Sequence, residues 1–81
     1  MFMFERTIKF DTITQVQKFV TTISGIQADF DLIHGRYIID GKSIMGIFSL
    51  DLSHPLLLRV HTEDNMIESY IDKELKELEL V

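Results

Sequence analysis

Residues 3 to 10 alternate between apolar and polar side chains, with the period of a half-buried β-strand. The apolar positions are Phe4, Ile8 and Phe10, and polar residues lie between them. Arg6 falls on the apolar face of this strand. We expect its methylene groups to lie along the edge of the core while its guanidinium stays in water.

The next segment repeats its apolar residues at helical spacing. These residues are Ile13, Val16, Phe19, Val20 and Ile23. Thr12 and Gln15 have the spacing of a capping box, in which each side chain accepts a bond from a backbone N–H at the helix start. Gly25 is placed to end the helix in the left-handed conformation. The pattern therefore predicts an amphipathic helix between Thr12 and Gly25.

Two short extended runs follow. Residues 28 to 32 alternate again, with Asp29 and Asp31 on the polar face, and residues 37 to 39 come after a turn at Gly35. A β-hairpin is the simplest interpretation. We interpret the two aspartates as a solvated strand edge, because acid–base catalysis would need a pocket that an open sheet does not offer.

A short helix and a further strand come next. Ser43 can cap an apolar helix over residues 44 to 50. After a turn that ends at Pro55, residues 56 to 61 predict a strand with Leu56, Leu58 and Val60 on one face.

The last segment predicts a closing helix with one apolar stripe. Asn65 and Glu68 have capping-box spacing. The stripe consists of Ile67, Tyr70, Ile71, Leu75 and Leu78. Charged residues occupy the other face, which is typical of a solvated helix surface.

In order, the elements are strand, helix, strand, strand, helix, strand and helix. One four-stranded sheet can place all three helices on a single face, which is an α+β arrangement of two layers. The 81 residues have room for one hydrophobic core. We therefore predict a single domain over residues 1–81.

Composition and charge narrow the classes of function. The chain has no cysteine, which excludes disulfides, thiolate catalysis and cysteine-ligated zinc. Its net charge of -5 disfavours binding to nucleic acid or anionic lipid. The apolar first residues are not accompanied by the cationic segment and the cleavage site of a signal peptide. No apolar run is long enough to span a bilayer. We therefore expect a cytoplasmic protein without membrane contact.

The histidines show no metal-ligand spacing. His34 falls in the predicted hairpin turn, His54 in a loop and His61 at a strand end. We interpret them as surface residues and predict no metal site. The sequence indicates no cofactor.

Residues 42–50 carry a resemblance to a known family. They read Lys-Ser-Ile-Met-Gly-Ile-Phe-Ser-Leu, which closely resembles the regulatory-serine region of the histidine-containing phosphocarrier protein (HPr) family. In that family a Lys-Ser-Ile-Met-Gly run opens the short second helix. The resemblance implies an open-faced β-sandwich: a four-stranded antiparallel sheet, bare on one side, with three helices on the other, in the order βαββαβα.

The chain departs from the family at the phosphorylation site. In the family a Gly-x-His-x-Arg-Pro motif joins the first strand to the first helix, and its histidine carries phosphate from enzyme I to sugar permease subunits. Residues 10–16 of this chain read Phe-Asp-Thr-Ile-Thr-Gln-Val, without histidine, arginine or proline. A helix dipole, worth about 1 kcal/mol, cannot replace a missing nucleophile. The resemblance therefore implies an HPr-like protein without phosphohistidine transfer.

Ser43 corresponds to the serine that an HPr kinase phosphorylates in many Gram-positive bacteria. A helix cap and a phosphorylation site are compatible roles, because a helix start accommodates negative charge. The resemblance also implies a partner-binding surface, formed by Lys42, Ser43, Ile44, Met45, Ile47 and Phe48. The alternative is that Ile44, Ile47 and Phe48 simply fill the core.

These observations lead to one functional hypothesis and two alternatives. The hypothesis is a non-enzymatic HPr-like protein, related to the phosphotransferase system, that acts by binding a protein partner, with Ser43 as its switch. One alternative is a phosphocarrier of the sugar phosphotransferase system that uses a different phosphoacceptor. The other is a module whose likeness to HPr ends at the fold.

Overall fold

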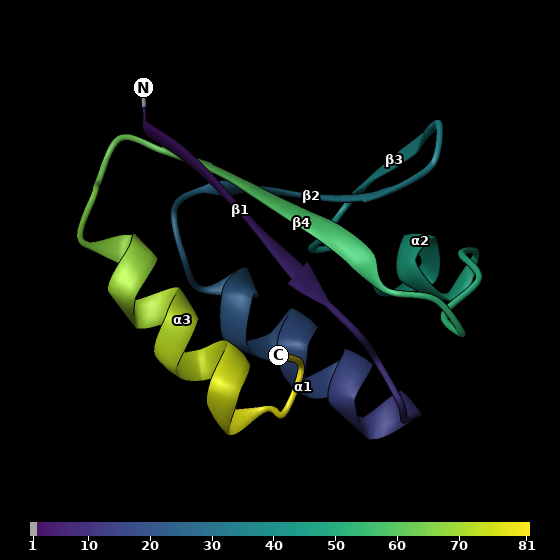
Figure 1. The fold of residues 1–81 in the computed structure, drawn as a ribbon. Coiled ribbons are helices and arrows are strands. Elements are labelled where there is room, and N and C mark those ends of the chain that lie inside the picture. The colour runs from purple at the N-terminus through teal and green to yellow at the C-terminus, as the bar shows by residue number, and fades with distance from the viewer. Residues whose placement is uncertain (1) are drawn as a thin grey trace.

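The computed structural model describes residues 2–81, and they form the predicted element order βαββαβα. The elements are β1 (Phe2–Ile8), α1 (Ile13–Ser24), β2 (Asp29–His34), β3 (Tyr37–Asp40), α2 (Ile44–Phe48), β4 (Leu56–Thr62) and α3 (Ile67–Glu77). The strands form one antiparallel sheet in the order β1-β4-β2-β3. All three helices lie on the same side of this sheet (Figure 1). The predicted open-faced α+β architecture is confirmed.

A continuous apolar core lies between the sheet and the helices. Its helical part contains Val16, Phe19, Ile23, Ile47, Ile71 and Leu75, and its strand part contains Phe4, Ile8, Phe30, Leu32, Leu56, Leu58 and Val60. Each such side chain stabilises the fold by roughly 1.5–3 kcal/mol relative to an exposed position. The apolar residues that recur every second position in the strands and those that recur at helical spacing therefore pack into one core between the sheet and the helices.

The two ends of α1 differ in how well local sequence predicts them. The capping box is confirmed, because the Gln15 N–H donates to Thr12 Oγ1 at 3.1 Å and the Thr12 N–H donates to Gln15 Oε1 at 3.0 Å. The left-handed stop at Gly25 is wrong, since this residue has φ -86° and ψ 0°. The glycine with positive φ is Gly35, at 60° in the turn between β2 and β3.

The start of α3 also differs from the prediction. Asn65 and Glu68 do not form a capping box: the helix begins after Met66, and Asp64 Oδ1 accepts the Met66 N–H at 2.9 Å. Glu68 bonds to β1 instead of to the helix start. Tyr70 does not belong to the apolar stripe, because its side chain is largely exposed while Ile71 and Leu75 are buried.

Arg6 joins β1 to α3 through a partly exposed ion pair. Its guanidinium lies 2.6 Å from the Glu68 carboxylate and 2.7 Å from that of Asp72. The hydrogen bonds that Arg6 donates to Asp72 and Glu68 raise the pKa of Arg6, and the bond that Asp72 accepts lowers the pKa of Asp72. The side chain stays partly exposed, as expected, but the sequence did not predict its carboxylate partners on the facing helix.

Candidate functional site

The segment between β3 and α2 fixes the position of Ser43. Gly41 packs directly on Phe30: a Cβ at residue 41 would lie 3.0 Å from the Phe30 Cβ, and the Gly41 N–H donates to the Phe30 carbonyl at 2.6 Å. The Ser43 N–H then donates to the Asp40 carbonyl at 3.0 Å. Together these bonds hold the start of α2 against the sheet.

Ser43 caps α2 as predicted. It has an extended backbone, with φ -95° and ψ 104°, and its Oγ accepts the Gly46 N–H at 3.1 Å. A Cβ at residue 46 would lie 3.1 Å from this Oγ, so glycine leaves the hydroxyl its space. The Ser43 residue is half-buried. The Ser43 hydroxyl therefore caps α2 and lies at the edge of the α2 surface.

The side chains of α2 divide between core and surface. Met45 is 77% exposed and Phe48 is 41% exposed, and residues three apart in a helix share a face. Ile47 is completely buried, and Ile44 is partly buried against the core. Ile47 is therefore wrong as a partner-binding residue, because its side chain already fills the core. The remaining apolar surface of α2 consists of Met45 and Phe48.

Lys42 is occupied within the fold. Its ammonium donates to the Ile26 carbonyl at 2.7 Å and lies 5.6 Å from the centroid of the Phe30 ring. These contacts tie the loop between α1 and β2 to the start of α2. The predicted role of Lys42 in partner binding stays a prediction, and its observed contacts are those of a structural anchor.

The N-terminus of α1 is the place where the resemblance to the HPr family would put a phosphate-carrying histidine, and residues 10–16 contain none. The N–H groups of Asp11 and Thr12 both donate to Gln15 Oε1, at 2.7 and 3.0 Å. Gln15 Nε2 also donates to the Leu78 carbonyl at 3.1 Å. Gln15 therefore occupies the N–H groups of Asp11 and Thr12, and it connects the start of α1 to the C-terminal segment. Carboxylates of α3 and of the segment after it line the same depression, together with Lys18.

Two of the three histidines lie side by side, which the sequence did not predict. The rings of His34 and His54 have centroids 5.8 Å apart, and His54 Nε2 lies 3.4 Å from Asp51 Oδ2. Hydrogen bonds from Ser53 lower the pKa of Asp51. Within residues 2–81, no group of three or more His, Cys, Asp or Glu residues could hold a metal ion.

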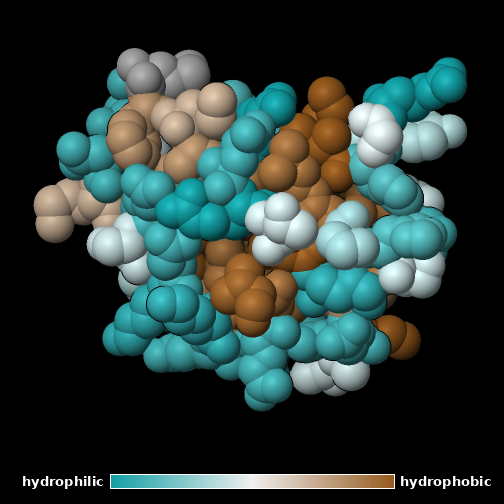
Figure 2. Space-filling model, in the orientation of Figure 1, coloured by the Kyte–Doolittle hydropathy of each residue, from teal (hydrophilic) through white to brown (hydrophobic). Residues whose placement is uncertain are grey.

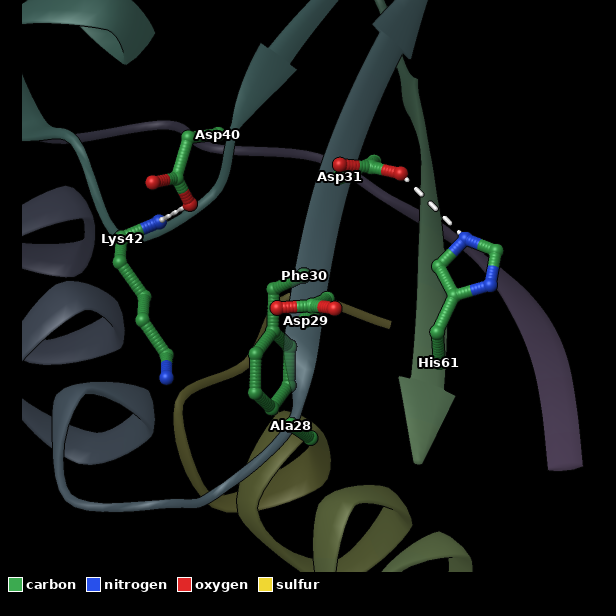
Figure 3. A pocket seen from close by; sticks show the side chains of 7 residues that line it. All are labelled: Ala28, Asp29, Phe30, Asp31, Asp40, Lys42 and His61. Carbon is green, nitrogen blue, oxygen red and sulfur yellow. Dashed lines mark hydrogen bonds and ion pairs between the residues drawn. The ribbon is translucent and has the colours of Figure 1, made fainter. Parts of the chain in front are cut away.

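The open face of the sheet holds a shallow hollow that the sequence also missed. Its lining includes Asp29, Asp31, Asp40 and His61, which Figure 3 shows around β2. Asp31 Oδ2 lies 3.4 Å from His61 Nε2 on β4. The interpretation of the two aspartates as a strand edge is wrong for Asp31, because β2 lies between β4 and β3 there.

Comparisons with known proteins support the fold assignment. The structure is similar to the crystal structure of a phosphocarrier protein HPr from Bacillus anthracis strain Ames, with a TM-score of 0.64 and 19% sequence identity. The match covers 94% of this chain and 92% of that chain. No protein-family model matches the sequence, and no curated protein sequence matches it. None of the helices within residues 2–81 has the length and apolar character that crossing a membrane requires. The chain therefore has an HPr-like fold.

Proposed function

We propose that this chain is a cytoplasmic, single-domain, HPr-like protein, related to the phosphotransferase system, that acts by binding a protein partner and catalyses no reaction. The observation that carries this proposal is the exposure of Met45 and Phe48 on one face of α2. Clustered exposed apolar side chains favour protein contact, and methionine adapts well to a partner surface.

The start of α1 supports the absence of phosphohistidine transfer. A phosphoryl acceptor there would need an imidazole nucleophile and free N–H groups to hold the phosphate. Residues 10–16 contain no histidine, and Gln15 occupies the N–H groups of Asp11 and Thr12. Glu77 and Glu79 also line this region and would repel a phosphate.

Ser43 is the switch in this proposal. A phosphate on Ser43 would add a charge of about -1.5 to -2 within one helical turn of Met45. That charge would alter partner affinity directly, through attraction or repulsion across the contact, and would not require a different fold. The position of Ser43 at the start of α2, where the residue is partly exposed, supports this assignment.

The partner surface can be tested by substitution on α2. The purified protein would be immobilised and exposed to an extract of the source organism, and captured proteins would be quantified by mass spectrometry. We expect Met45→Asp and Phe48→Asp to lose a partner that the wild type captures. Ile13→Asp is the matched control, because Ile13 is an exposed apolar residue on α1. Equal capture by all the variants, each checked for folding by circular dichroism, would contradict the proposal.

A further inference from the structure

The open face of the sheet carries a row of apolar residues where simple alternation would place polar ones. Leu57 lies between the buried Leu56 and Leu58, so its side chain points to the open face. Leu57 pairs with Ile33 across β4 and β2, and Ile33 pairs with Ile38 across β2 and β3. Strand register thus brings three aliphatic side chains from separate segments into one row.

The helices lie on the other side of the sheet and leave this row uncovered (Figure 1). Ile38 is 61% exposed, and Ile33 and Leu57 are only partly buried. Figure 2 shows apolar side chains gathered between hydrophilic ones in the upper part of the molecule, where Figure 1 draws the sheet. A contiguous, partly exposed apolar strip of this kind favours contact with another molecule.

Acidic residues border the apolar row. The neighbouring positions on the open face are Glu5, Arg59, Asp31 and Asp40, followed by Met3, His61 and Asp29. Arg59 is paired with Glu5 at 2.7 Å, and Asp31 lies beside His61. Asp29 is exposed at the rim of the hollow in Figure 3. Carboxylates therefore outnumber cationic groups on this side of the apolar row.

We propose that this open face is a docking surface for a cationic amphipathic segment of a partner protein. The apolar side of the segment covers Ile33, Ile38 and Leu57, and its Lys or Arg side chains lie near Asp29 and Asp40. A second copy of the chain fits less well, because the same carboxylates would face each other. This surface lies across the sheet from α2, so the inference is independent of the proposed function.

The probe is a synthetic amphipathic helix of leucine and lysine, about 18 residues and five turns long. Two reference peptides keep the length: one replaces lysine with glutamate, and one replaces leucine with serine. Titration into the isotope-labelled protein, followed by amide chemical shifts, locates the contact, and calorimetry gives the dissociation constant. We expect the leucine–lysine peptide to shift amides of β2, β3 and β4 and to bind more tightly than either reference.

Two pairs of variants separate specific docking from general attraction to an acidic protein. Ile38→Thr should weaken binding roughly tenfold, because it removes apolar carbon that the bound peptide would cover, while Ile13→Thr on α1 should not change it. Asp29→Lys should weaken binding more than Glu77→Lys on α3, although both variants change the net charge equally.

Several results would overturn the inference. Shifts confined to α1, α2 or α3 would place the peptide elsewhere. If the two variants of either pair changed peptide affinity equally, the peptide would be attracted to the protein without binding at a defined surface. A homodimer detected by analytical ultracentrifugation, and dissociated by Ile38→Thr, would assign the open face to a second copy.

Discussion

Replacing Ile47 and Met45 by alanine tests the division of α2 into core and surface. Ile47 is completely buried, so Ile47→Ala removes buried apolar carbon and leaves a cavity. At about 0.8 kcal/mol for each methylene, plus a cavity term, the expected loss in the free energy of unfolding is about 2–5 kcal/mol. Met45 is mostly exposed, and Met45→Ala should change that free energy by less than about 0.5 kcal/mol.

The assay is urea unfolding monitored by circular dichroism, with the wild type, Ile47→Ala and Met45→Ala measured in parallel. For a slope of roughly 1–1.5 kcal/mol per molar urea, Ile47→Ala should lower the midpoint by more than about 1 M. If that variant does not fold, Ile47→Val should still fold and lose about 0.5–1.5 kcal/mol. Equal losses for Ile47→Ala and Met45→Ala would refute the division on which the proposed partner surface depends.

Two further predictions concern other contacts of the fold. Arg6→Met should destabilise the protein at neutral pH by less than about 1 kcal/mol, because the pairs with Glu68 and Asp72 are partly exposed. The ion pair lowers the pKa of Asp72 below 3.8, so its contribution is present at neutral pH and is lost as the pH falls through that lowered value. Urea midpoints of both proteins should therefore converge in acid, and a gap that persists there would contradict the assignment. Thr12→Ala should cost about 1 kcal/mol by removing the α1 cap, whereas Thr14→Ala on the first turn should cost less than about 0.5 kcal/mol. Similar losses for the two threonine variants would show that the cap contributes little.

Sequence periodicity predicted the elements because it reports local burial. The apolar residues of α1 and the alternation in β4 recur within one element, and the Thr12–Gln15 capping box closes within four residues. The same reasoning could not decide which glycine takes positive φ. Gly25 can stop a helix in either conformation, whereas the tight turn between β2 and β3 imposes φ of 60° on Gly35.

The contacts that sequence reasoning missed are those between distant segments. Arg6 and Asp72 are 66 residues apart, and only the packing of α3 under β1 brings them together. The apolar row on the open face depends on strand register, which pairs Leu57 with Ile33 and Ile33 with Ile38. A signal for that row is present in the sequence as broken alternation, since apolar residues occupy consecutive positions at 56–58 and 38–39.

Site-resolved mass spectrometry tests most directly whether the chain acts without phosphohistidine transfer. The purified protein would be incubated separately with phosphoenolpyruvate plus enzyme I and with ATP plus HPr kinase, under conditions that preserve acid-labile phosphate. We predict no phosphate on His34, His54 or His61 in the first reaction, and phosphate on Ser43 alone in the second. Phosphate on any histidine would contradict the account and would assign the chain to phosphotransfer through a different acceptor.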